Sequence, residues 1–122
     1  MSFSGLSLGG PDAVDAALHS ALDGIALRQR VIADNIANVD TPGFRATTVD
    51  FEASLRAAIA SGDPSDLAIS TTPTDTPVGP NDNNVDLRKE TLAAVQSQFQ
   101  YQVMTRAVSD RAELLRAAAG SQ

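Results

Sequence analysis

Few side chains in this sequence could take part in acid–base or nucleophilic chemistry. The only histidine, His19, follows Asp15 by one helical turn, and such a pair needs a pocket that excludes water before it can transfer protons usefully. On the flank of a helix a pair of this kind is usually solvated. The serines lack the glycine-framed turn that exposes a catalytic hydroxyl. The sequence therefore predicts that the protein is not an enzyme, and a small hydrolase is the weakest alternative.

Metal and phosphate ligands are missing from the pattern as well. The chain has no cysteine, which excludes disulfides and cysteine-based zinc sites. The glycines match no phosphate-binding loop. The densest carboxylate group is spaced unlike a calcium loop; it consists of Asp34, Asp40, Asp50 and Glu52. We expect no catalytic, cofactor-binding or metal-binding residues, no cofactor and no small-molecule substrate.

Composition limits the size of the core and the kinds of partner. A chain of 122 residues with 4% aromatic residues forms one domain at most and has little core of its own. Its net charge of −6 argues against binding nucleic acid or an anionic membrane surface. No run approaches the roughly 20 apolar residues that span a bilayer, and no cleavable signal peptide is evident. We expect a subunit that buries its helices by assembling with copies or relatives.

The first expected element is a long helix over 12–40, preceded by a flexible N-terminus over 1–11. Pro11 suits the first turn of such a helix. Gly24 in its middle costs about 1 kcal/mol relative to alanine and indicates close backbone approach or bending. The apolar positions form a narrow seam for contact with another helix; they are Leu18, Leu22, Ile25, Ile32, Ile36 and Val39.

A turn and a short helix are expected over 41–60. Proline followed by glycine at Pro42 and Gly43 favours a type II turn. Residues 47–51 alternate as in an extended segment, and Asp50 is a candidate cap for the short helix. Residues 61–84 are mostly Ser, Thr, Pro, Gly, Asp and Asn, so we expect a flexible loop there unless a partner orders it.

A second long helix is expected over 85–120, with Asp86 as its cap and Gly120 near its end. Its apolar seam consists of Leu92, Val95, Phe99, Val103 and Leu114. The predicted fold class is all-α. The long N- and C-terminal helices pack as an antiparallel-type coiled-coil hairpin, and the short helix or extended segment and the flexible loop lie between them.

Polar residues near the seams leave two interpretations open. The amides of Asn35 and Asn38 could fix register by hydrogen bonding across a subunit boundary. Alternatively, Asn38 helps end the helix and Asn35 is a solvated position. The same choice between lateral contacts and solvation applies to a group on the second helix, namely Gln96, Gln98, Gln100 and Gln102.

The segment ANVDTPGF (residues 37–44), together with the two residues before it, follows a long N-terminal helix. This segment resembles the signature of the bacterial flagellar rod and hook family of axial proteins. The matching residues are Asn35, Ile36, Ala37, Asn38, Thr41, Pro42, Gly43 and Phe44. A second match over 83–90 includes Asn84, Val85 and Asp86. The short stretch between the two helices is similar to that of the family's proximal rod members, whereas longer members carry a β-rich domain there.

The resemblance implies a structural subunit of the proximal rod of the flagellar basal body, linking the MS ring and export gate to the rest of the rod. It implies a helical homo-oligomer, contacts with other rod proteins of the FlgC and FlgF type, a FliE-type adaptor between the MS ring and the rod, and the flagellar export gate. It also implies a place within the periplasm and export without a cleaved signal peptide. Phe44 is expected to anchor the turn against a neighbour. The alternative from another class is a cytoplasmic helical adaptor or secretion chaperone.

Overall fold

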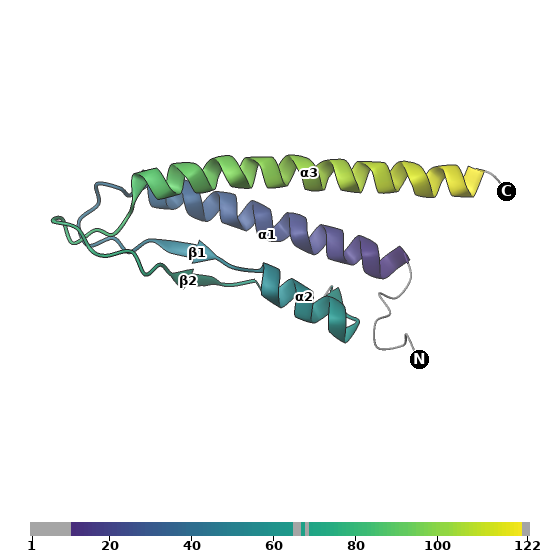
Figure 1. The fold of residues 1–122 in the computed structure, drawn as a ribbon, viewed down its shortest axis with the longest axis horizontal. Helices are drawn as coiled ribbons and strands as arrows, with labels where there is room; N and C mark the ends of the chain where they lie inside the picture. The colour runs from purple at the N-terminus through teal and green to yellow at the C-terminus, as the bar shows by residue number, and fades with distance from the viewer. Residues whose placement is uncertain (1–10, 65–66, 68, 121–122) are drawn as a thin grey trace.

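Two long antiparallel helices determine the shape of the molecule. The computed structural model describes residues 11–64, 67 and 69–120. Its elements, in chain order, are α1 (Pro11–Ala37), β1 (Thr47–Val49), α2 (Glu52–Ser61), β2 (Thr71–Pro73) and α3 (Leu87–Gly120). α1 and α3 lie side by side, while β1, β2 and α2 form a second layer along α1 (Figure 1). The predicted helical hairpin is confirmed, and the structure adds a small two-stranded sheet.

Side chains form hydrogen bonds with backbone groups at the end of α1 and at the start of α3. α1 ends at Ala37, three residues before the end of the range predicted from the sequence. The side-chain amide of Asn38 donates to the Asp34 carbonyl oxygen at 2.8 Å, so Asn38 helps to end the helix. At the start of α3 the backbone N–H of Lys89 donates to the carboxylate of Asp86 at 3.1 Å, which confirms the predicted cap.

Residues 1–10 lie outside the described part of the chain, so the flexible N-terminus expected over 1–11 is described only at Pro11, where α1 begins. The segment expected to be a flexible loop over 61–84 contains β2, which pairs antiparallel with β1 so that Thr48 lies opposite Thr72. Composition did not indicate this strand, because threonine favours a strand only where a partner strand is present.

The second layer rests on a close contact between α1 and Phe51. Phe51 occupies the position before α2 and makes no side-chain cap bond, so the expected cap by Asp50 is not formed. A Cβ atom added to Gly24 would lie 2.6 Å from Cγ of the Phe51 ring. Of the two alternatives predicted from Gly24, close approach or bending, the structure shows a close approach, made by the Phe51 ring. Glycine is required there because any side chain would displace the ring.

The core is small and lies mainly between α1, β1 and the start of α2. Its buried members are Ala21, Ile25, Val49 and Phe51, with Met104 of α3 packed against them. Polar pairs hold α3 against α1 along the remaining length: Asp15 with Arg111, Arg28 with Gln100, and Asn35 with Glu90. Each step forward along α1 is matched by a step back along α3, so these pairs specify one antiparallel register.

Candidate functional site

The TPGF segment forms a tight turn at the end of α1. The backbone N–H of Phe44 donates to the Thr41 carbonyl oxygen at 3.2 Å, and Gly43 has a φ of 77°. These are the features of the predicted type II turn, in which the third residue needs a positive φ that glycine adopts without strain. Phe44 is half-buried within the single chain.

Asn83 joins this turn to the segment that precedes α3. Its side-chain amide donates to the carbonyl oxygens of Asn38 and Thr41, both at 2.8 Å, and its side-chain oxygen accepts from the backbone N–H of Val85 at 2.8 Å. One buried side chain therefore satisfies three backbone groups from two segments about 40 residues apart in the sequence. The two sequence motifs form one structural unit, which we call the asparagine clamp (residues 38–46 and 81–85).

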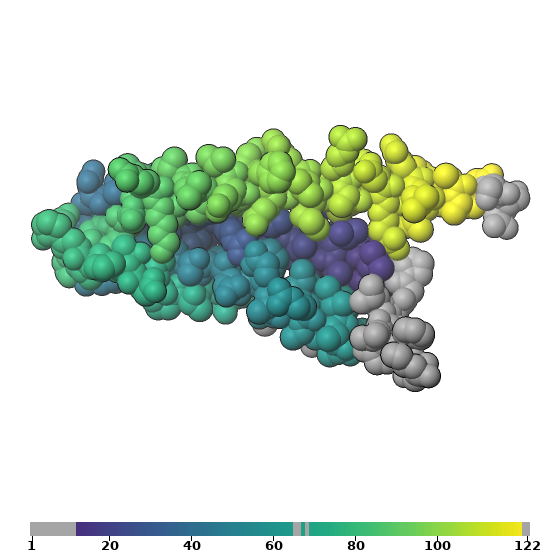
Figure 2. Space-filling view, viewed as in Figure 1, coloured from purple at the N-terminus to yellow at the C-terminus, as the bar shows by residue number. Residues whose placement is uncertain are grey.

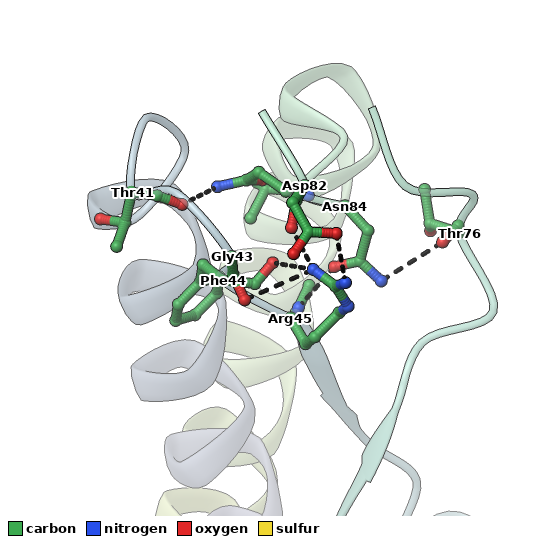
Figure 3. A network of polar contacts seen from close by, with 10 residues as sticks. Thr41, Gly43, Phe44, Arg45, Thr76, Asp82 and Asn84 are labelled. Carbon is green, nitrogen blue, oxygen red and sulfur yellow. Dashed lines mark hydrogen bonds and ion pairs between the residues drawn. The ribbon is translucent and has the colours of Figure 1, made fainter. Parts of the chain in front are cut away.

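Asn84 fastens the other side of the clamp. Its side-chain oxygen accepts from the backbone N–H of Ala46 at 2.6 Å, and its amide donates to the Thr76 carbonyl oxygen at 3.2 Å. Nearby, Arg45 pairs with the carboxylate of Asp82 at 2.7 Å and also donates to the Asp82 carbonyl (Figure 3). Sequence reasoning selected Asn84 but gave no role to Asn83 or to the Arg45–Asp82 pair, because their partners are distant in sequence.

Asn35 fits neither of its two sequence interpretations. The side chain is 1% exposed and lies within the single chain. Its amide donates to the Thr47 carbonyl oxygen at 2.8 Å and to the Glu90 carboxylate at 3.0 Å, while its oxygen accepts from the Thr47 N–H at 3.2 Å. Asn35 is therefore neither solvated nor free for a contact across a subunit boundary; it connects α1, β1 and α3.

The Glu90 carboxylate is buried in this contact. Burial raises its pKa, and the hydrogen bond from Asn35 partly offsets the rise. The opposite shift occurs at Glu52, where the hydrogen bonds from Arg28 lower the pKa of the carboxyl. Ionisation of Glu90 therefore destabilises the folded chain, whereas ionisation of Glu52 stabilises it.

Arg28 organises the second layer from the middle of α1. Its guanidinium makes two hydrogen bonds to Glu52, at 2.6 and 2.8 Å, and donates to the Val49 carbonyl oxygen at 2.6 Å. It also lies 4.9 Å from the centroid of the Phe51 ring, within the range of a cation–π contact. The position of Arg28 between buried Ile25 and Ile32 was the available sequence signal, since a charged residue in a buried row usually has a partner.

The apolar seam predicted for α3 does not face α1. Four of its members follow each other at three- or four-residue spacing on one side of the helix, and all are largely exposed: Leu92 at 59%, Val95 at 64%, Phe99 at 66% and Val103 at 49%. Leu114 is exposed at 66%. We call these five residues the outer row. Within the single chain these residues therefore do not make the contact between α1 and α3, and their role as a seam for contact with other helices stays a prediction.

A mainly polar row of residues, with one methionine, makes the contact with α1 instead. Along α3 they recur every seven residues, as Glu90, Ser97, Met104 and Arg111, and are buried or half-buried. The packed row of α1 is displaced from the predicted one in the same way. Ile25 and Ile32 are buried as predicted, whereas Leu18, Leu22 and Val39 are only half-buried. The row passes instead through Ala21, Arg28 and Asn35. Apolarity alone could not reveal it, because two of its five members, Arg28 and Asn35, are polar.

The described residues contain no arranged chemical centre. His19 is exposed, and its ring nitrogen Nδ1 lies 2.8 Å from the Asp15 carbonyl oxygen, one turn earlier in α1. In residues 11–64, 67 and 69–120, no three His, Asp or Glu side chains gather closely enough to hold a metal ion. None of the helices described here combines the length and apolar character needed to cross a membrane.

A helical hairpin with an internal clamp and an exposed apolar row defines a structural subunit made for assembly. The family profile described as Flagella basal body rod protein matches residues 17–45, which include most of α1 and the TPGF turn. The chain is 34% identical to the flagellar basal body rod protein FlgB of Borreliella burgdorferi over 109 residues, covering 71% of this chain and 81% of the relative.

FlgB of Escherichia coli is 31% identical over 122 residues, covering 80% of this chain and 88% of the relative. FlgB of Bacillus subtilis is 34% identical over 100 residues, covering 71% and 78%. The chain belongs to the FlgB family of flagellar basal body rod proteins. It is a structural subunit of the flagellar rod, and the family is not one of enzymes.

Proposed function

We propose that the chain occupies the proximal part of the rod, where it joins the MS ring and export gate to the rest of the rod across the periplasm. The expected neighbours are copies of itself, other rod proteins, the adaptor at the rod base and the export gate. The chain would reach this position by export through the flagellum's own export apparatus. The short connection between the long helices, which holds only β1, α2 and β2, supports a slender subunit of the inner rod.

The observation that carries the proposal is the outer row. Largely exposed leucine, valine and phenylalanine side chains follow one side of α3 over several turns, and a contiguous apolar surface of this kind marks a protein interface. The polar contacts with α1 hold the opposite part of α3 in place. The outer row is therefore left for neighbouring subunits, where its burial contributes about 25 cal/mol per Å².

We assign the asparagine clamp the role of setting the direction in which the chain leaves the helical hairpin. The clamp connects the end of α1 to the start of α3 through Asn83 and Asn84. Because neither side chain depends on a neighbour for these bonds, the subunit enters the rod with this end already formed. Phe44, half-buried at the turn, is available for the contact with a neighbour that the family resemblance implies.

A charge placed in the outer row tests this proposal. In Leu92→Asp, we expect the helical hairpin to remain folded, because Leu92 is exposed in the single chain, and rod assembly to be lost because the interface would bury an unpaired charge. Ser109→Asp, on an exposed polar position of α3, is the matched control and leaves assembly intact. Ile32→Asp differs from both, since Ile32 is 6% exposed and the substitution should unfold the hairpin itself.

Mass spectrometry of purified basal bodies gives the readout, together with far-ultraviolet circular dichroism of each purified variant. The wild-type chain should be present in the basal body, and deleting its gene should leave a base without a rod. A chain that stays in the cytosol would instead indicate a helical adaptor or chaperone. Assembly of Leu92→Asp at the wild-type level would show that the outer row is not the interface.

A further inference from the structure

A groove runs between α2 and α3 along the surface of α1. Both helices pack beside α1, and the space between them has a volume of about 370 Å³. Its floor is formed by Ile25 and Phe51 of the core, and its walls by Leu55 of α2 and by Phe99 and Val103 of α3. Phe99 and Val103 also belong to the outer row, so the groove continues the proposed assembly surface toward the core.

Toward the strands the groove becomes polar. A wider section of about 580 Å³ lies between β1 and α3, and it shares Glu52 and Gln100 with the apolar section. Asp75 lines this polar section and has no ion-pair partner among the residues that the structure describes. Arg28, paired with Glu52, and Lys89 line the same section, so the groove changes from apolar beside α2 to mixed charge beside the strands, with Asp75 as an unpaired carboxylate there.

The C-terminal part of α3 extends beyond the start of α1. The Asp15–Arg111 pair joins the two helices near this end. Four residues of α1 lie beyond this pair, whereas nine residues of α3 do. Residues 113–120 are all exposed, including Leu114 at 66%. The helix projects past the other elements (Figures 1 and 2). We call residues 112–120 the overhang.

We propose that the overhang of one copy occupies the groove between α2 and α3 of a second copy. This inference rests on the proposed function and specifies which surfaces meet. An amphipathic helix laid in an apolar groove is a common mode of recognition. With the donor α3 parallel to the acceptor α3, Leu114 of the overhang enters the apolar section. Arg106 precedes the overhang, about two turns before Leu114; it is exposed, lies 3.9 Å from Asp110, and reaches the mixed-charge section near Asp75. The order of apolar and charged groups is the same along both partners.

The proposed contact joins two different surfaces, and this distinguishes it from pairing of two outer rows. A contact between unlike surfaces repeats without closing and produces a helical assembly, whereas a twofold contact closes as a dimer. A rod requires the first kind. Because Leu114 lies about a dozen residues along α3 from the middle of the groove, neighbouring copies are offset by about 20 Å along the helix axis.

Paired cysteines test the contact, since the chain has no native cysteine to interfere. Cells carrying Leu55→Cys with Leu114→Cys as their only copy are treated with a mild oxidant, and the products are separated on a denaturing gel. We expect a ladder of dimers, trimers and longer chains, because each copy contributes one cysteine to each of two contacts. Ala57→Cys with Leu114→Cys is the matched control. Ala57 is exposed on α2 and does not line the groove, so no ladder should form.

Two results would overturn the contact while leaving the proposed function intact. One is the absence of cross-links in cells that swim and whose basal bodies contain the paired variant. The other is a single dimer band that also forms with Leu114→Cys alone, because this band would show that two overhangs pair with each other. A product containing a different protein would assign the groove to another rod component and would equally reject the second copy. Failure of the proposed function is distinct, since the wild-type chain would then be absent from basal bodies.

Discussion

Asn35 of α1 donates a hydrogen bond to Glu90 of α3 at 3.0 Å, inside the contact between the two helices. The glutamate is 6% exposed. Among the described residues its carboxylate has one hydrogen-bonding partner, this neutral amide, while the charges of Lys89 and Asp86 act on the carboxylate from a distance. Asn35 also holds both backbone groups of Thr47. A single amide thus couples the helical hairpin to β1, and the carboxylate that it contacts is stabilised less well than it would be in water.

The stability of the hairpin should depend on pH through Glu90. Burial raises the pKa of this carboxyl in the folded chain, so the folded state binds the proton more tightly than the unfolded state does. The contribution of Glu90 to the free energy of unfolding is therefore fully present below the ordinary glutamate pKa and is lost as pH rises through the raised pKa. In Glu90→Gln, which keeps an oxygen for Asn35, we expect this loss to disappear and stability at neutral pH to rise.

Urea unfolding of the purified chain at a series of pH values measures this effect. Glu113→Gln, at an exposed position of α3, is the control and should change stability by less than about 0.5 kcal/mol. The pKa of Glu52 is lowered, so protonation of Glu52 destabilises the folded chain only at still lower pH. The effects of Glu90 and Glu52 on stability therefore occupy different pH ranges. A lower stability of Glu90→Gln at neutral pH would show that the ionised carboxylate is favoured in the fold.

Removing Asn83 should loosen the asparagine clamp. Asn83→Ala leaves the N–H of Val85 without its partner and removes one of the two donors to each carbonyl oxygen of Asn38 and Thr41, which keep their backbone bonds. Because this site is largely buried, we expect a loss of about 1–3 kcal/mol in the free energy of unfolding. Asn81→Ala is the matched control: Asn81 is exposed and its amide makes one bond, to Asp40 at 3.2 Å, so the loss should stay below about 1 kcal/mol.

Equal losses for Asn83→Ala and Asn81→Ala would contradict the central place given to Asn83. The same two variants also separate folding from assembly. If the clamp sets the exit of the chain from the hairpin, basal bodies should contain less of Asn83→Ala than of Asn81→Ala. Quantitative mass spectrometry of basal bodies measures this difference directly.

The helices and the TPGF turn of this fold were predictable from local patterns, whereas β2 and the contacts between the elements were not. Pro42 and Gly43 specify their turn by backbone preference alone, and Asp86 caps α3 through a residue three positions away. The clamp depends on pairs such as Asn83 with Thr41, and the second layer on Arg28 with Glu52. Such pairs leave no periodic signal. For the outer row, the pattern correctly marked an apolar face, but which partner it meets is a property of the assembly.

Phe51 packs so closely on α1 that Gly24 should not tolerate a side chain. In Gly24→Ala the new Cβ would lie 2.6 to 2.7 Å from three carbons of the ring, and the ring is also held by Arg28 on its face. Overpacking of this kind costs about 1–3 kcal/mol, which exceeds the gain of about 1 kcal/mol from replacing glycine within a helix. We expect lower resistance to urea. Gly120→Ala should show no such loss, because a Cβ added there would meet no side chain or neighbouring element of the described part of the chain within 4 Å.

A smaller side chain at position 51 should offset part of the stability lost in Gly24→Ala. Phe51→Ala placed in the Gly24→Ala background removes Cγ, Cδ1 and Cδ2, the three atoms that clash, so the double variant should be more stable than the sum of the two single changes indicates. Simple additivity of the two changes would contradict the close contact.

Ser97 occupies the inner face of α3 at a place where its hydroxyl is a disadvantage. The residue is 0% exposed, and its Oγ has no hydrogen-bond partner among the described residues, whereas the hydroxyl would be fully hydrated in the unfolded chain. Ser97→Ala keeps the side chain small enough for α1 and α3 to remain close and removes the unpaired group. We expect the free energy of unfolding to rise by about 1 kcal/mol. Ser109→Ala, exposed on the same helix, should stay within about 0.5 kcal/mol of the wild type. Urea titrations of both variants under one set of conditions decide the point, because a decrease for Ser97→Ala would mean that the hydroxyl is bonded in solution.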